Sequence, residues 1–167
     1  MSGEVASGQA PLLDAIDWRW RRFDELQVRE LQYIYAARQI AFAIEQQCIY
    51  LDVDGCDEQA FHLAAWSSAQ REPLAYARVI DPGVKYAEVS IGRVVTVGAG
   101  RGRGLGREVM VRAVAHAAGV WPGAAIRISA QTRLERFYAS LDFVAVGPPY
   151  LEDGIDHTEM LLAAKPV

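Results

Sequence analysis

The spacing of hydrophobic residues predicts a chain that combines strands and helices. Apolar residues at three- and four-residue steps predict a helix from about residue 27 to 45, and similar spacing predicts helices over 107–116 and 132–141. Short apolar runs, some of them alternating with polar residues, predict strands. These strands cover residues 17–23, 61–66, 74–80, 87–97, 125–129, 143–146 and 157–162.

The order of these elements indicates the fold class. Several antiparallel strands come first and a strand–helix–strand unit follows, which favours an α/β (α+β) fold with a mixed sheet and helices on both faces. The length of 167 residues suits one domain, and no internal repeat or linker divides the sequence. We therefore expect a single domain over residues 15–167, preceded by a flexible tail at residues 1–14.

Composition and charge narrow the class of protein. With 51% hydrophobic and 23% charged residues, the chain is typical of a globular protein, and its formal net charge of −4 argues against a nucleic-acid partner. No apolar run reaches the roughly 18 residues needed to cross a bilayer. The first ten residues lack the basic and apolar regions of a signal peptide. We therefore expect no membrane partner and a cytoplasmic location.

The cysteines and histidines do not predict a metal site. Cys48 and Cys56 are the only cysteines, and without a secretory signal both are expected to be reduced. Together with His62, His116 and His157 they show none of the spacings that zinc sites use. No metal is expected.

The clearest candidate chemistry lies in the stretch Arg101-Gly102-Arg103-Gly104-Leu105-Gly106, between a predicted strand and a predicted helix. Its alternate glycines let the backbone approach a ligand closely and adopt positive φ. The free N–H groups of a helix's first turn, with the positive end of the helix dipole, form an anion site. Arg101, Arg103 and Arg107 add positive charge. The stretch predicts a phosphorylated ligand, and the alternative is a surface turn.

The spacing argues against two common phosphate-binding loops. A dinucleotide fingerprint needs glycines at i, i+2 and i+5, and no register that begins between Gly98 and Gly104 meets this requirement. A P-loop needs Gly-Lys followed by Ser or Thr, whereas Gly106 is followed by Arg107 and Glu108. A nucleotide-binding protein is therefore a disfavoured alternative.

What remains is Arg-x-x-Gly-x-Gly, from Arg101 to Gly106, which resembles the pyrophosphate loop of the GNAT superfamily of N-acetyltransferases. A second segment, Gln131 to Tyr138, resembles another GNAT signature, in which a Phe-Tyr pair lies on a helix. Asp142 stands where that signature has a glycine as a left-handed helix cap, and Asp tolerates this conformation better than most residues. Further blocks resemble the ElaA-like branch. They include Tyr35-x-x-Arg38, Phe42-x-x-Glu45-Gln46, Ala75 to Val79, Ile91 to Val94, and Asp153 to His157.

This resemblance implies a mostly antiparallel sheet of six to seven strands and acetyl-CoA as the acyl donor. The main chain of residues 102–107 is then expected to hold the pyrophosphate, and the strand before it, which splays from its parallel neighbour, to pair with pantetheine. Dimerisation is common in the family, so a homodimer is also considered. The expected donor-binding residues are Val94, Val95, Thr96, Arg101, Gly102, Arg103, Gly104, Leu105, Gly106, Arg107 and Gln131.

The resemblance also implies that an amine attacks the thioester directly. Tyr138, which follows Phe137 in the matched motif, is expected to act as general acid toward the leaving thiolate, and its alternative role is packing. The base that accepts the amine proton is sought among Glu45, His62, His157 and Glu159. His157 ranks first because it belongs to the last matched block and because imidazole has a suitable intrinsic pKa. Each candidate also has a structural alternative.

The acceptor is expected to be a small-molecule or peptide amine. The acidic loop Asp52, Asp54, Asp57 and Glu58 is either solvated surface or a means of drawing a cationic amine to a nearby mouth. The competing function is a non-catalytic acyl-CoA-binding module. Such a module would keep the glycine loop but would need neither Tyr138 nor an acceptor pocket.

Overall fold

The computed structural model describes residues 16–164, so the tail predicted at residues 1–14 lies outside the described residues. Its strands form one eight-stranded sheet. The strands are β1 Asp17–Arg22, β2 Ala60–Trp66, β3 Ala75–Ile80, β4 Val89–Thr96, β5 Ile126–Gln131, β6 Val144–Ala145, β7 Tyr150–Glu152 and β8 Ile155–Leu162. The helices are α1 Val28–Arg38, α2 Leu105–Val120 and α3 Glu135–Ala139, with the π-helical segment η3 Gln39–Glu45 continuing α1.

The strand order is β1-β2-β3-β4-β5-β8-β6, and β7 pairs with β8 as a hairpin. Every pairing is antiparallel except that of β4 with β5. This confirms the predicted mixed, mostly antiparallel sheet. The strand count of six to seven was too low, because β7 has only three residues between Pro149 and a tight turn, too few to show a period.

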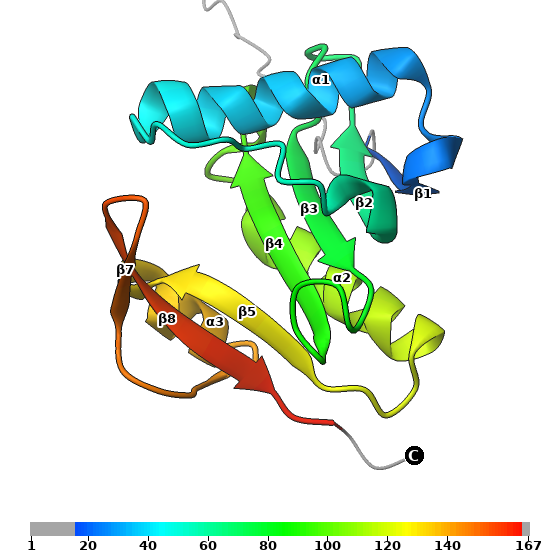
Figure 1. The fold of residues 1–167 in the computed structure, drawn as a ribbon. Coiled ribbons are helices and arrows are strands. Elements are labelled where there is room, and N and C mark those ends of the chain that lie inside the picture. The colour runs from blue at the N-terminus through cyan, green and yellow to red at the C-terminus, as the bar shows by residue number, and fades with distance from the viewer. Residues whose placement is uncertain (1–15, 165–167) are drawn as a thin grey trace, which may run out of the picture.

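Helices cover both faces of the sheet, as predicted. On one face, Ile34 and Ala37 of α1 pack with Tyr76 and Val95. On the other face, buried residues of α2 pack in a larger cluster against alternate residues of β3 and β4. Because successive side chains of a strand point to opposite faces, both clusters draw on the same strands. Figure 1 shows α1 crossing in front of the upper strand ends and α2 behind the sheet.

The sheet opens between its two halves. β4 and β5 pair only at Val89 with Ile126 and at Ser90 with Arg127, and beyond Ser90 the two strands diverge (Figure 1). β4 also carries a β-bulge opposite β3, where Arg93 has a φ of 53°. A bulge bends its strand and increases the local twist, which favours the divergence. The predicted splay of β4 from its parallel neighbour is confirmed.

The helix boundaries differ from the predicted ones for identifiable reasons. The helix predicted over 107–116 runs from Leu105 to Val120, because its first turn lies within the glycine stretch and Gly119 does not end it. The helix predicted over 132–141 is a 3-10 turn, Thr132–Leu134, followed by the short α3. The chain leaves α3 through Asp142, whose φ of 68° confirms the predicted left-handed cap.

Candidate active site

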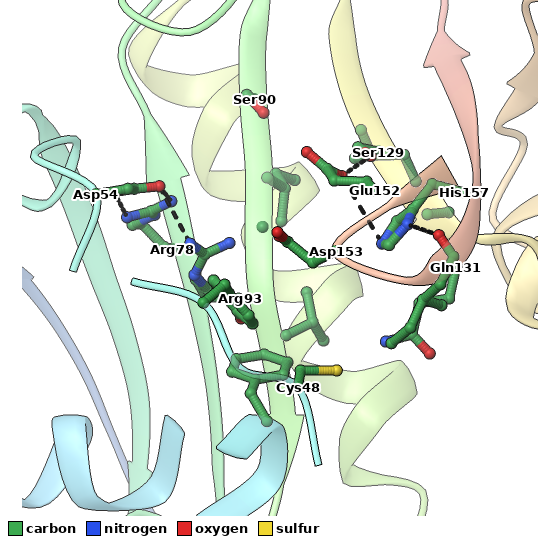
Figure 2. Close-up of a pocket in the computed structure, with 18 of the residues that line it drawn as sticks. Cys48, Asp54, Arg78, Ser90, Arg93, Ser129, Gln131, Glu152, Asp153 and His157 are labelled. Carbon is green, nitrogen blue, oxygen red and sulfur yellow. Dashed lines mark hydrogen bonds and ion pairs between the residues drawn. The ribbon is translucent and has the colours of Figure 1, made fainter. Parts of the chain in front are cut away.

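A cleft of about 370 Å³ lies where β4 and β5 diverge. One wall comes from β3 and β4, with Arg78 and Ser90, and the other from the β7–β8 hairpin, with Glu152, Asp153 and His157 (Figure 2). Gln131 and Tyr138 also line it, as does the segment that follows η3. The cleft therefore joins residues from the middle and the end of the chain at the break in the sheet. Open sheets of this kind bind ligands at such positions.

The glycine stretch forms the N-terminal end of α2. Gly102 and Gly104 have φ values of 68° and 75°, in the left-handed region that favours glycine. No backbone N–H from Gly102 to Arg107 has a hydrogen-bond acceptor among residues 16–164. Nothing lies within 4 Å of where a Cβ of Gly102 or Gly104 would be. The stretch thus presents unpaired N–H groups, with the helix dipole behind them, on an open surface.

Of the arginines in and beside the glycine stretch, Arg101 and Arg107 have side-chain partners and Arg103 has none among the described residues. Arg101 donates to the carbonyl oxygen of Thr96 and to the carboxylate of Glu45. Arg107 donates to both the hydroxyl and the carbonyl oxygen of Ser140. Arg103 is exposed and makes no side-chain hydrogen bond within the part of the chain that the structure describes. Glu45 is therefore placed beside the glycine stretch, and it is not among the residues that line the cleft.

The strand that leads into the stretch has one free edge. Val95 and Thr96 pair with Tyr76 and Ala75 of β3, but the edge of β4 that faces β5 has no strand partner beyond Ser90. Val94 also lines the cleft. An unpaired strand edge offers N–H and C=O groups to an extended ligand.

Tyr138 is buried, with 8% of its surface exposed, and packs edge-on against Phe137 and Phe143. Its hydroxyl has no hydrogen-bond partner among the described residues, although the side chain lines the cleft. Burial raises the pKa of Tyr138 to about 12. At neutral pH it is therefore a protonated phenol with a free donor.

His157 projects from β8 into the same cleft (Figure 2). Its Nδ1–H donates to the carbonyl oxygen of Ile155 at 2.8 Å, which leaves Nε2 with its lone pair in the neutral ring. Nε2 lies 3.8 Å from Oε2 of Glu152, and Ser129 donates to the same oxygen at 3.1 Å. A further hydrogen bond joins Ser129 to the hydroxyl of Tyr150. The sequence analysis did not single out Glu152 or Ser129, because their contacts with each other and with His157 join different strands and leave no pattern along the chain.

The other candidate bases lie elsewhere. His62 is 1% exposed and bonds to the Tyr76 hydroxyl and the Asp57 carbonyl, and burial lowers its pKa. Glu159 pairs with Arg127 at 2.9 Å. Neither lines the cleft. Of the four side chains considered from the sequence, the cleft therefore contains His157.

Gln131 spans the open end of the cleft. Its amide donates to the side-chain oxygen of Gln46, which follows η3, at 2.9 Å. Its own amide oxygen accepts from Nε of Arg133. Gln131 thus joins the end of β5 to the segment after η3, on the side of the cleft where β4 and β5 are farthest apart.

Three of the four carboxylates in the acidic loop are paired with arginines. Asp52, Asp54 and Asp57 alternate with three arginines in a closed ring of ion pairs with N–O distances from 2.7 to 3.2 Å. The arginines are Arg38, Arg78 and Arg93, and we call the six residues the Arg–Asp ring. Solvated surface is therefore wrong for Asp57, which is 2% exposed. The arginines neutralise all three aspartates, so these carboxylates supply no net charge to attract an amine. A sequence signal for the ring existed: Arg78 interrupts the apolar run Ala75–Ile80, and the structure buries every residue of that strand.

Two negative findings apply to residues 16–164. No helix there is long and apolar enough to cross a membrane. No three His, Cys, Asp or Glu side chains there are grouped so that they could hold a metal ion.

Comparison with known proteins identifies relatives over most of the chain. The acetyltransferase (GNAT) domain family matches residues 32–164. A UPF0039 protein of Synechocystis is 39% identical over 151 residues, which cover 90% of this chain and 97% of that protein. Protein ElaA of Escherichia coli is 34% identical over 147 residues, covering 87% of this chain and 95% of ElaA.

Solved structures agree with the sequence matches. An acyl-CoA N-acyltransferase from Pseudomonas aeruginosa superposes with a TM-score of 0.83 at 39% identity, covering 89% of this chain and 99% of that one. The crystal structure of E. coli ElaA gives a TM-score of 0.80 at 33% identity, covering 87% of this chain and 98% of that one.

Proposed function

The chain belongs to the GNAT family of acetyltransferases, in its ElaA-like branch, and we propose from this that it transfers an acetyl group from acetyl-CoA to a primary amine. The amine attacks the thioester directly while both substrates are bound. The observation that carries the proposal is the juxtaposition in one cleft of a free strand edge, an unpaired phenol at Tyr138 and an imidazole at His157.

The donor binds along the diverging edge of β4. The pyrophosphate contacts the unpaired N–H groups from Gly102 to Arg107, with charge from Arg101 and Arg103 nearby. Pantetheine lies along the main chain of Val94, Val95 and Thr96, in the place that another strand would take in a continuous sheet. Gln131, at the end of β5, bounds this part of the cleft through its hydrogen bond to Gln46.

The reaction requires three transfers. His157 Nε2 takes a proton from the acceptor ammonium, and the N–H electron pair remains on the amine nitrogen. That pair forms a bond to the carbonyl carbon, a backbone N–H of the free β4 edge stabilises the oxyanion, and the C–S bond then breaks toward sulfur. Tyr138 donates to the departing sulfur, and the proton that the new amide nitrogen loses restores the phenol. Glu45, which pairs with Arg101, lies outside this proton path.

The test is calorimetry with coenzyme A followed by an acceptor screen. We expect coenzyme A to bind, whereas ATP and NAD do not, and amines to accelerate thiol release from acetyl-CoA. Protein that binds coenzyme A but transfers no acetyl group to any amine would support the alternative, a non-catalytic acyl-CoA-binding module. No heat on titration with coenzyme A would refute both.

A further inference from the structure

With a neutral His157 ring, two hydrogen-bond acceptors face each other in the cleft, Nε2 of His157 and Oε2 of Glu152. Nδ1 of His157 must donate to the Ile155 carbonyl, because a carbonyl oxygen can only accept, so Nε2 is the acceptor nitrogen of the neutral ring. Oε2 of Glu152, 3.8 Å away, accepts from Ser129 and belongs to a carboxylate. This separation is too long for a direct hydrogen bond, yet two electron-rich atoms repel each other at this distance.

We propose that Glu152 and His157 form the binding site for the ammonium group of the acceptor. An ammonium nitrogen about 2.8 to 2.9 Å from both atoms would subtend an angle of about 85°, which bent N–H hydrogen bonds can accommodate. One N–H then donates to Oε2 of Glu152 and a second to Nε2 of His157. The two remaining positions on nitrogen carry the alkyl chain and the third proton. This inference rests on the proposed function and names the group that the site recognises.

The surroundings hold both acceptors in place. Ser129 on β5 donates a hydrogen bond to the carboxylate of Glu152 (Figure 2). The hydroxyl of Tyr150 bonds to Ser129, so residues of β5 and β7 hold the carboxylate in its orientation. The carbonyl oxygen of Ile155, two residues earlier on β8, fixes the imidazole by accepting from Nδ1–H. Neither group depends on the other for its orientation, so both point into the cleft before a ligand arrives. Pre-positioned acceptors of this kind bind with little ordering cost.

The carboxylates of the cleft that lie outside the Arg–Asp ring are both on the hairpin. The Arg–Asp ring contains three arginines and three aspartates and is neutral as a unit. Glu152 and Asp153 lie outside the ring and make no ion pair with an arginine or lysine among the described residues. Lys85 also lines the cleft outside the ring; its ammonium lies 5.3 Å from the ring centroid of Tyr86 and pairs with no carboxylate among the described residues. Ser90, 3% exposed, lines the same cleft and its hydroxyl has no partner within residues 16–164. The β4 wall therefore offers an uncommitted hydroxyl across the cleft from the hairpin carboxylates.

The site also explains how the bound ammonium becomes a nucleophile. The N–H bond that points at His157 breaks, its electron pair stays on the amine nitrogen, and the proton moves to Nε2. Glu152 then stabilises the imidazolium that forms 3.8 Å from it. Rotation about the C–N bond turns the freed lone pair toward the thioester while another N–H donates to Glu152.

The test uses n-butylammonium as the probe and the ring nitrogens of His157 as the readout. The full chain, with and without coenzyme A, is titrated at constant pH up to about 0.1 M probe, enough to fill most of a site with a Kd of about 10 mM. The chain has three histidines, so His62 and His116 serve as internal references. We expect the Nε2 resonance of His157 to shift saturably and the other two to stay unchanged. An unshifted His157 resonance overturns the inference.

Matched probes and variants separate a hydrogen-bonded site from general attraction. Butyltrimethylammonium has the same charge but no N–H, so we expect it to leave His157 unshifted; an equal shift counts against the proposal. Glu152→Gln is expected to weaken n-butylammonium binding about 10-fold, since it removes one charge-assisted hydrogen bond. Asp156→Asn removes a charge from an exposed neighbour that does not line the cleft and should change the Kd less than about twofold.

The binding readout is independent of turnover. If amines shift His157 as expected but no acetyl group is transferred, the proposed reaction fails while the ammonium site stands. If thiol release with n-butylamine is fast and its KM is the same in Glu152→Gln and wild type, the reaction stands and the ammonium site fails.

Discussion

Replacing Tyr138 with phenylalanine tests the central step of the proposed chemistry. The hydroxyl has no partner among the described residues, so its removal leaves no buried group unsatisfied and keeps the packing against Phe137 and Phe143. We therefore expect the free energy of unfolding to change by less than about 1 kcal/mol. Any larger loss of activity must then come from the missing O–H.

The expected loss of kcat in Tyr138→Phe follows from comparing the pKa of Tyr138 with that of the leaving thiol. The pKa of Tyr138 is raised to about 12, whereas the leaving thiol has a pKa near about 8.5, so complete proton transfer to a free thiolate is uphill by about 3.5 pKa units, or about 5 kcal/mol. The phenol therefore donates a hydrogen bond to sulfur as charge develops, and its proton moves to sulfur only as the proton of the new amide nitrogen replaces it. Such a bond contributes about 1.5 to 3 kcal/mol, and partial proton transfer adds to it. We expect kcat to fall by about 10- to 1,000-fold, nearer the lower end.

The assay is steady-state thiol release with saturating acetyl-CoA, combined with calorimetry of coenzyme A. Tyr138→Phe should bind coenzyme A within about twofold of wild type, since the hydroxyl does not hold the donor. Tyr33→Phe is the matched control, because Tyr33 does not line the cleft and makes no side-chain hydrogen bond among the described residues. Unchanged kcat in Tyr138→Phe would remove Tyr138 from the reaction. A fall in wild-type activity between pH 8 and 10, about two or more units below its pKa, could not be assigned to ionisation of Tyr138.

Three further predictions concern the donor loop and the Arg–Asp ring. Gly104→Ala forces a φ near 75° on a residue with a Cβ, so it should cost about 1 to 2 kcal/mol of unfolding free energy and weaken coenzyme A binding, as measured by urea unfolding and calorimetry. Arg78→Met removes a guanidinium that is 1% exposed and leaves Asp54 and Asp57 without one of their cations, so it should lower the free energy of unfolding by about 3 kcal/mol. The control is Arg112→Met, which removes an exposed ion pair with Glu108 on α2 and should lower the free energy of unfolding by less than about 1 kcal/mol. For Asp54, burial opposes ionisation but hydrogen bonds from Arg78 outweigh it, so its pKa is lowered in the folded protein. Its carboxylate therefore stabilises the fold above the unfolded pKa of about 4 and loses that contribution as the pH falls. The urea midpoint should drop between pH 5 and 3, and drop less in Arg78→Met; equal drops would contradict this role.

The parts of the site that the sequence predicted depend on neighbours along the chain. The stretch from Arg101 to Gly106 has its strand before it and its helix after it, and the left-handed cap at Asp142 follows directly from the end of α3. The splay of β4 was also accessible, because the matched motif lies on that strand. These features need only local conformation, which short patterns encode.

The parts that the sequence did not predict depend on contacts between distant segments. The Arg–Asp ring joins α1, the acidic loop, β3 and β4, and no spacing along the chain indicates which arginine meets which aspartate. Glu45 was a candidate base because its charge was visible but its position was not; the π-helical turns of η3 place it beside Arg101. Glu152 was missed because β7 is too short to show a period. Charge alone therefore did not locate the acceptor side of the cleft.

The pairing of the acidic loop changes where an acceptor amine is expected to approach. Four carboxylates in one loop suggested attraction from that side, but arginines that are themselves mostly buried neutralise three of them. Removing those charges from consideration leaves Glu152 and Asp153, on the opposite wall, as the carboxylates of the cleft that make no ion pair with an arginine or lysine within residues 16–164. The ring then fixes the wall beside β3 and β4, and the hairpin supplies the charge. If the proposed ammonium site is correct, selection among amines is expected to depend on side chains of β7 and β8 rather than on the paired wall beside the bulge at Arg93.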